Sequence, residues 1–253
     1  MIVLKAPAEI VLMRESGRIV ALVLAELKAR VKPGVTLLEL DALAESIIIA
    51  EGGTASFKNY RPESAPFPFP ATICASLNDE IVHGIPTSRK LREGDIIKID
   101  VGVKKNGYHA DSAISVPVGK VSAEAEKLMR VTQECLAEAI KVARAGNRLG
   151  DLGHAIQKTA ESQRFSVVRE YTSHGVGRDL HEGFSMMNVG EPGQGMLLRP
   201  GLTIAVEPMI NAGRPETKVK KDQWTVATID GKISAHFEHT IAITDGEPEI
   251  LTK

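Results

Sequence analysis

Residues 97–113, IKIDVGVKKNGYHADSA, place two aspartates eleven residues apart around an Asn-Gly pair, and the expected architecture follows from this segment. This dipeptide most often forms a two-residue hairpin turn, and the alternation of apolar and polar residues around it indicates two antiparallel strands. With the turn at 106–107, Gly102 lies opposite Asp111. Asp100 and Asp111 then share one face of the hairpin as diagonal neighbours, within about 7–8 Å of each other.

Like charges held close together resist ionising, so a pair of neighbouring aspartates needs an explanation. Two interpretations are possible. In the first, the hairpin has a solvated face and both carboxylates are exposed, which is the commoner situation on such strands. In the second, a cation lies between Asp100 and Asp111, and Gly102 leaves room there for something other than a side chain. The hairpin alone favours the first interpretation, so the decision depends on residues downstream.

Three later stretches carry candidate partners for these aspartates. SHGVGRDLH (173–181) contains two histidines around two glycines, LTIAVEPMI (202–210) ends an apolar strand with a glutamate, and AHFEHTIAI (235–243) contains another. A buried carboxylate is costly unless something pairs with it. Four carboxylates and one imidazole make an oxygen-rich set suited to a pair of divalent ions: Asp100, Asp111, His174, Glu207 and Glu238. We assign no role to His109, His154, His236 and His239.

The order of expected helices and strands repeats along the chain. Apolar residues at helical spacing predict a helix over residues 8–30, and Thr36 with Glu39 forms a capping box for a second helix that ends at Gly52-Gly53. Ser122 begins a third helix, expected to end at Gly146, and a fourth follows over 149–163. Strands are expected at 72–77, 95–103 and 108–116, and an irregular proline-rich loop at 57–70.

An offset of 112 residues relates these two series and aligns Gly34 with Gly146 and Leu37 with Leu149. Each helix pair precedes strands that carry isolated acidic residues. We therefore expect one α+β domain over residues 1–253, with two similar halves at about 1–120 and 121–253. The helices are expected on one face of an antiparallel sheet.

The composition limits the classes of protein to which this chain can belong. The chain has 253 residues, 43% of them hydrophobic, and 31 basic side chains against 32 acidic ones. This balance argues against nucleic acid or an anionic membrane as the main partner. Two distant cysteines, Cys74 and Cys135, do not make a disulfide framework. Charged residues interrupt the apolar N-terminal stretch, so we expect no signal peptide, no membrane span and a cytoplasmic location.

Taken together, these motifs resemble the methionine aminopeptidase family of pita-bread metallopeptidases. The resemblance is carried by D-x-G-x-x-x-x-G-Y-x-x-D at 100–111, HGVG at 174–177, HE at 181–182, EPM at 207–209, EHT at 238–240, SLNDEIVHGIP at 76–86 and DQWTVAT at 222–228. It runs over nearly the whole chain. We expect neither a zinc-binding N-terminal extension nor a long insertion between His181 and Glu207. The chain is therefore most similar to the type I, bacterial-style enzymes. The family fold has two pseudo-symmetric halves around a dinuclear metal site.

The resemblance implies a role for each matching residue. Asp111 and Glu238 would bridge two divalent ions of the cobalt, manganese or iron(II) kind, Asp100 would bind one ion, and His174 and Glu207 the other. Glu207 would also act as general base, while His83 and His181 would contact the substrate. The methionine pocket would be formed near Phe69, Cys74 and Trp224, although a lone tryptophan is more often core and a buried cysteine is usually inert packing.

The implied reaction is hydrolysis that removes the N-terminal methionine from nascent proteins when the second residue is Gly, Ala, Ser, Thr, Cys, Pro or Val. N-terminal methionine peptides would be the partners, with the ribosome as a further one, and no specific nucleic acid or membrane; a monomer is expected. The sequence departs from the family pattern around the methionine pocket at Leu180, at Gly183-Phe184 and at Pro68.

Two alternatives remain at this point. Proline dipeptidases and aminopeptidase P share the fold and metal set but usually carry a large extra N-terminal domain. Binding proteins with the same fold have lost their metals and act through protein or nucleic-acid contacts. Those proteins lose ligands, whereas this chain keeps all five. Metal content would separate the second alternative, and activity on Met-Ala against X-Pro peptides would separate the first.

Overall fold

The computed structural model describes residues 2–63 and 65–253, so Met1 and Ser64, the latter in the predicted 57–70 loop, lie outside it. The helices are α1 (Pro7–Arg30), α2 (Leu37–Ala50), α3 (Ala123–Val142) and α4 (Leu149–Ser162). The strands are β1 (Thr54–Ala55), β2 (Ile73–Leu77), β3 (Glu80–Val82), β4 (Ile96–Lys105), β5 (Tyr108–Pro117), β6 (Ser166–Val167), β7 (Thr172–Gly175), β8 (Glu182–Met187), β9 (Thr203–Val206), β10 (Met209–Asn211), β11 (Thr217–Val219), β12 (Val226–Thr228), β13 (Ser234–His236), β14 (His239–Ala242) and β15 (Glu249–Ile250).

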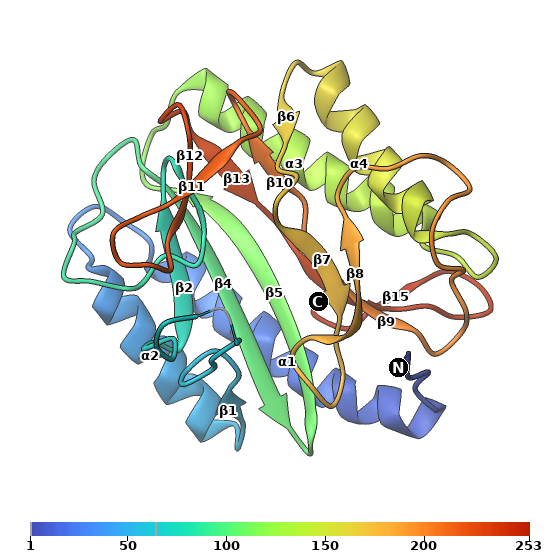
Figure 1. Cartoon of the computed structure of the whole chain (residues 1–253). Coiled ribbons are helices and arrows are strands. Elements are labelled where there is room, and N and C mark those ends of the chain that lie inside the picture. The colour runs from blue at the N-terminus through green and yellow to red at the C-terminus, as the bar shows by residue number, and fades with distance from the viewer. Residues whose placement is uncertain (1, 64) are drawn as a thin grey trace.

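The strands form four antiparallel sheets. One holds β1, β4, β2 and β5, and a second has the order β15-β14-β9-β7-β8; the two smaller ones are β13-β10-β6 and β11-β12-β3. In Figure 1 the helices lie behind the strands, with α1 and α2 behind β4 and β5, and α3 and α4 behind the later strands. The expected α+β class, with helices on one side of antiparallel sheet, is confirmed.

The β4–β5 hairpin has the predicted register. Gly102 pairs with Asp111, and Asn106 and Gly107 have φ values of 52° and 82°, the positive values that a type I′ turn requires. However, neither face of the hairpin is solvated: Lys98 is 1% exposed and Asp111 is 3% exposed. The interpretation of the hairpin as a half-solvated strand is therefore wrong, because other segments cover the polar face.

Two cores lie on the helical side of the sheets. The apolar face of β4, including Ile97, Ile99 and Val101, packs in a cluster with residues of α1 and α2. A second cluster joins the buried faces of α3 and α4 to β9, β10 and β13. Since apolar side chains fill the space between helices and strands, the polar residues of β4 and β5 are directed to the opposite side.

The 112-residue repeat extends to element boundaries. α2 at 37–50 corresponds to α4 at 149–162, the ends of α1 and α3 at residues 30 and 142 correspond, and β1 at 54–55 corresponds to β6 at 166–167. Gly34 and Gly146 have φ values of 93° and 94° in equivalent turns. The third helix ends at Val142, four residues before the expected Gly146, and the Asn147 side chain donates a hydrogen bond to the Val142 carbonyl at 2.8 Å.

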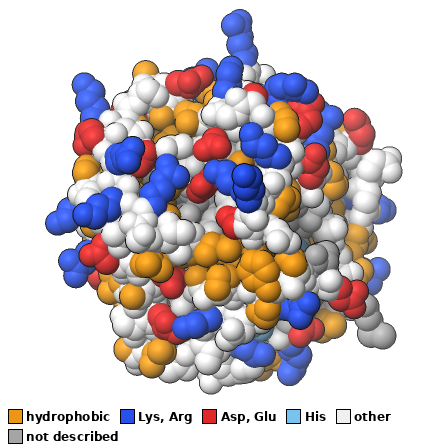
Figure 2. Space-filling view, turned by 60° about the vertical axis from the view of Figure 1, so that its left-hand side comes forward, with side chains coloured by type: hydrophobic (Ala, Val, Ile, Leu, Met, Phe, Trp, Pro, Cys, Tyr) orange, Lys and Arg blue, Asp and Glu red, His pale blue; other side chains and the backbone are white. Residues whose placement is uncertain are grey.

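Charged side chains of both signs are distributed over the surface, and the cysteines are unpaired. Figure 2 shows positive and negative side chains interspersed over one face, around a group of hydrophobic ones. Within the described part of the chain, no helix combines the length and apolarity needed to span a bilayer. Cys74 and Cys135 are both free and buried.

Candidate active site

One cavity of about 340 Å³ brings all of the sequence-predicted site residues together. They come from both halves of the chain, which places the cavity where the halves meet. Its walls include His83, Asp100, Asp111, His174, His181, Glu207 and Glu238, and also Phe69, Cys74 and Trp224.

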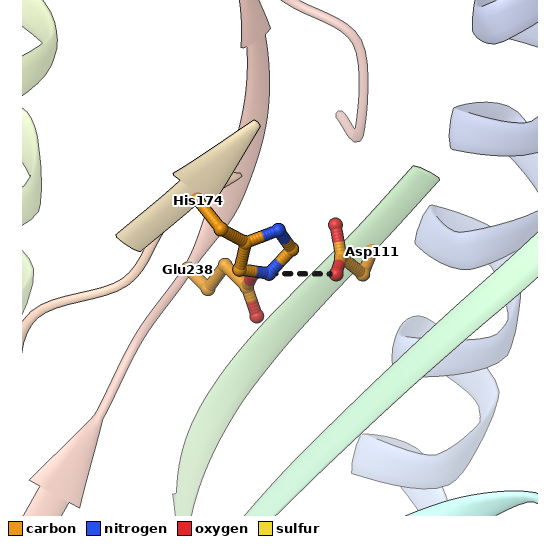
Figure 3. Close-up of side chains that lie close together, drawn as sticks. All are labelled: Asp111, His174 and Glu238. Carbon is orange, nitrogen blue, oxygen red and sulfur yellow. Dashed lines mark ion pairs between the residues drawn. The ribbon is translucent and has the colours of Figure 1, made fainter. Parts of the chain in front are cut away.

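Three of these side chains converge from separate elements. Asp111 is on β5, His174 is on β7, and Glu238 lies in the link between β13 and β14. Figure 3 shows the three pointing toward one another, and one ligand atom from each lies within 4.8 Å of the others. Each is buried, so the cluster lies in a region of low dielectric.

Hydrogen bonds between the two halves hold these carboxylates in place. The Asp111 N–H donates to the Thr240 hydroxyl at 3.0 Å, and the Glu238 N–H donates to the Ala113 carbonyl at 2.9 Å. The Ser112 hydroxyl donates to the Glu238 carbonyl. These contacts join residues about 125–130 apart in sequence, so β5 and the segment around Glu238 form one unit.

His174 is oriented by its own strand. Its Nδ1 is 3.0 Å from the Gly175 carbonyl, so this nitrogen carries the proton in the neutral ring and Nε2 faces the carboxylates. Nε2 lies 3.4 Å from Asp111 Oδ2 and 3.6 Å from Glu207 Oε1. A histidine whose other nitrogen is fixed in this way is suited to metal ligation.

Glu207 follows β9 and is held through its main chain. Its N–H donates to the Ser173 hydroxyl at 3.0 Å, and its carbonyl accepts from the Asn188 side chain at 2.9 Å. Its second carboxylate oxygen, Oε2, lies 3.5 Å from Nε2 of His236, a residue to which the sequence assigned no role.

Burial and like charge set the protonation of the cluster. Burial, followed by the negative charges of Asp111 and Glu207, raises the pKa of both Asp100 and Glu238 well above the usual carboxyl range. Burial alone would raise the pKa of Asp111, but the nearby His174 lowers it. Burial would likewise lower the pKa of His174, but Asp111 and Glu207 raise it to about 9.

The residues present fit a divalent cation. Asp100 Oδ1 is buried and, among the described residues, has no hydrogen-bond partner. A buried acceptor of this kind is costly unless it binds something. A set of buried carboxylates with one imidazole is a hard ligand set of the kind that manganese, iron or cobalt accepts. The donor chemistry therefore matches metal binding better than a solvated acidic cluster.

Metal binding is expected to release protons. In the metal-free protein at pH 7, His174 is protonated because its pKa is about 9, while burial and the neighbouring carboxylates raise the pKa values of Asp100 and Glu238. A cation requires the deprotonated forms, so affinity should rise with pH and weaken as pH falls below about 9. Calorimetric titration of Mn²⁺ into chelated protein, in two buffers of different ionisation enthalpy, should show release of about one proton or more. Equal heats in the two buffers would contradict it.

His181 lies beside the cluster and is held by its loop. The Tyr60 hydroxyl is 2.8 Å from His181 Nδ1. Glu182 pairs with the buried Lys5 and accepts the Arg178 N–H at 2.7 Å, which ties the loop to the N-terminal segment. Burial lowers the pKa of His181 to about 4, so the ring is neutral at pH 7.

His83 is the other imidazole outside the carboxylate cluster. It has a φ of 58°, an uncommon backbone conformation for a residue with a side chain. Its ring makes edge contacts with Tyr171 and Trp224, at centroid distances of 5.7 and 6.2 Å. Burial lowers the pKa of His83 to about 4, so this ring is also neutral at pH 7.

The apolar end of the cavity is a small cluster of its own. Phe69 and Cys74 are buried together, and Trp224 packs edge-on against Phe69 at 5.1 Å. Burial raises the pKa of the Cys74 thiol, so the side chain acts as an apolar wall and not as a nucleophile. Leu180, where the sequence departs from the family pattern, is also a wall residue. The sequence did not single out three further wall residues, since no motif marks them: Phe57, Tyr60 and Pro62.

Protein side chains pack closely against the glycines of the site, including Gly102. A Cβ on Gly102 would lie 2.8 Å from atoms of Ser56 and Phe57, so these side chains fill the space beside the aspartates. A Cβ on Gly175 would lie 2.6 Å from the Phe184 ring, and one on Gly177 would clash with Glu182. The prediction that Gly102 leaves room for something other than a side chain is therefore wrong, because the Ser56 and Phe57 side chains occupy that space.

The chain is similar to known peptidases. A family model described as "Metallopeptidase family M24" matches residues 11–245. "Methionine aminopeptidase 1" of Bacillus subtilis (strain 168) is 51% identical over 253 residues, which is 100% of both chains. The methionine aminopeptidase of Escherichia coli (strain K12) is 42% identical over 251 residues, covering 98% of this chain and 93% of the relative.

Solved structures give the same result. The crystal structure of methionine aminopeptidase from Thermotoga maritima has a TM-score of 0.96, with 43% identity and 100% of both chains covered. An Xaa-Pro dipeptidase from Bacillus anthracis has a TM-score of 0.78 with 19% identity, covering 99% of this chain and 62% of that one, and shows the fold alone. The chain therefore belongs to metallopeptidase family M24 and, within it, to the type I methionine aminopeptidases.

Proposed function

We propose that this protein removes the N-terminal methionine from nascent proteins when the second residue is small, using two divalent ions. The observation that carries the proposal is the cavity itself, in which the carboxylate cluster and the apolar cluster share one space of about 340 Å³. A methionine side chain is flexible and apolar, and it suits the end formed by Phe69, Cys74 and Trp224.

The metal ligands in this proposal are five residues of the cavity. Asp111 and Glu238 would bridge the ions, Asp100 would bind one of them, and His174 and Glu207 the other. When bound, divalent ions supply Lewis acidity, which lowers the pKa of a coordinated water and polarises a carbonyl group. Manganese, iron(II) and cobalt all suit such ligands, and availability decides among them.

The protein's own groups would carry the proton and the developing charge. Glu207 would accept a proton from the attacking water and pass it to the leaving amine. His83 and His181, both neutral at pH 7, would donate hydrogen bonds to the carbonyl oxygen as it becomes negative. The substrate's free α-amino group would bind beside the carboxylates, which limits cleavage to the first residue.

The wider setting follows from the same proposal. We place the protein in the cytoplasm as a monomeric single domain, residues 1–253, with halves at about 1–120 and 121–253. Two free, buried cysteines support a reducing compartment. Nascent chains would be presented at the ribosome, while no specific nucleic acid or membrane is part of the reaction.

Metal dependence tests the reaction. Chelated protein should release no methionine from Met-Ala-Ser, and adding back manganese, iron(II) or cobalt singly should restore release. Ala-Pro should not be cleaved under the same conditions, since the proline dipeptidases share the fold but differ in substrate. Full activity after chelation would contradict the proposal.

The second-residue limit gives a separate prediction. A series of Met-X-Ser peptides should be cleaved when X is Gly, Ala, Ser, Thr, Cys, Pro or Val and refused when X is Leu, Lys, Glu or Phe, because the X side chain would lie against His83 and residues 66–70. At the first position, leucine or norleucine should be cleaved more slowly, since a pocket discriminates by only about 1–3 kcal/mol per methylene. Equal cleavage of Met-Lys and Met-Ala would contradict the size limit.

A further inference from the structure

The Glu207 carboxylate lies between two imidazoles. Its Oε1 is 3.6 Å from Nε2 of His174, and its Oε2 is 3.5 Å from Nε2 of His236. The proposed reaction uses His174 as a ligand and leaves His236 without a role. The two histidines come from different strands, β7 and β13, and they approach the carboxylate from its two oxygens.

His236 is fixed by its main chain. The Ser115 hydroxyl accepts the His236 N–H at 2.9 Å and donates to the His236 carbonyl at 2.8 Å. In the β10–β13 pairing, His236 is opposite Met209, two residues after Glu207. The ring is therefore attached to a rigid segment immediately beside the strand end that carries Glu207.

The ring nitrogen that faces Glu207 has no other partner. His236 is 1% exposed, and its Nε2 is buried with no hydrogen-bond partner among the described residues. A buried ring nitrogen that lacks a hydrogen-bond partner is costly. At 3.5 Å from Nε2, Glu207 Oε2 needs a shift of about half an ångström to reach ordinary hydrogen-bond length.

We propose that His236 is a positioning residue for Glu207, donating from Nε2–H to Oε2 and so directing Oε1 toward the reacting water and the ligand cluster. The interaction uses the tautomer in which Nε2 carries the hydrogen. Fixing the carboxylate at one oxygen restricts its rotation, which serves both a metal ligand and a general base. The inference rests on the proposed role of Glu207.

Two amide substitutions separate a positioning role from a packing role. The side-chain nitrogen of His236→Gln reaches the place of Nε2, whereas that of His236→Asn reaches only the place of Nδ1. Both are polar, so the pair is matched for the cost of burial. His236→Leu removes every donor, and His154→Gln, on α4 and outside the cavity, is the control.

We expect the Gln variant to keep kcat close to the native value. The Asn and Leu variants should lose about tenfold or more in kcat with KM within about twofold, and they should bind Mn²⁺ about 10–100-fold more weakly in calorimetry, with unchanged stoichiometry. Equal kcat and metal affinity in Gln, Asn and native protein would overturn the inference. Equal impairment of Gln and Asn would do so too, and loss of one bound metal would make His236 a ligand. Absence of methionine release from the native protein would instead contradict the proposed function.

Discussion

Replacing Asp111 or Glu238 by alanine is expected to abolish turnover while the protein stays folded. Both side chains are buried in the carboxylate cluster, and with His174 they form the group whose ligand atoms lie within 4.8 Å. Loss of either removes a bridge between two ions in the proposed site. Since each tenfold in rate corresponds to about 1.4 kcal/mol and Lewis-acid stabilisation supplies several, the loss should be about 10³-fold or more.

Thermal unfolding with and without metal distinguishes this result from simple misfolding. Burial raises the pKa of Glu238, and glutamine is an uncharged side chain of the same shape, so Glu238→Gln should unfold at close to the native temperature without metal. Saturating Mn²⁺ should raise the unfolding temperature of the native protein, because a ligand that binds only the folded state stabilises it. The variant should gain much less from the same Mn²⁺.

The matched control is Glu249→Gln, a carboxylate that pairs with Arg14 and is not among the residues that line the cavity. It should keep native turnover and native stabilisation by Mn²⁺. An Asp111→Ala or Glu238→Ala variant that kept most of its activity with metal present would contradict the bridging assignment.

Local rules explain why the hairpin could be predicted. The Asn-Gly turn fixes the register of β4 and β5, and a period of two places Asp100 and Asp111 on the same face. Thr36 and Ser122 both accept hydrogen bonds at the helix starts predicted from them. Features that depend on a few consecutive residues are thus readable from the sequence.

Contacts between segments that are separated in the sequence could not be predicted from it. Lys98 on the polar face of the hairpin is buried in spite of its charge, and its ammonium donates to the Asn78 carbonyl, between β2 and β3, at 2.8 Å. Tyr60 contacts His181 across 121 residues, and His236 reaches Glu207 across a strand pairing that the sequence does not specify. The resemblance to a family identified the cavity residues that family motifs contain, but it did not identify these neighbours.

His181→Ala and His83→Ala are expected to keep bound metal and lose rate, which is the second large effect. The Tyr60 hydroxyl lies 2.8 Å from His181 Nδ1, and in the tautomer in which Nδ1 accepts from Tyr60, Nε2–H is the free donor of that ring. Removing one donor to a developing oxyanion typically costs about 10²–10³ in turnover. Both rings have pKa values of about 4, so this donor role should persist unchanged between pH 5 and pH 8.

The pH profile and the metal content of the variants together show whether His83 and His181 act as hydrogen-bond donors or as metal ligands. Lowering the pH through about 4 would protonate both rings, and because folding depresses their pKa values, it would also destabilise the folded state below the unfolded value of about 6.5. Tyr60→Phe should retain His181 but lose its orientation, and so should fall between the native protein and His181→Ala in turnover. His154→Ala, on α4, serves as the control for histidine removal. Calorimetry in which His181→Ala or His83→Ala no longer binds its full complement of Mn²⁺ would make that histidine a metal ligand and end its assignment as an oxyanion donor.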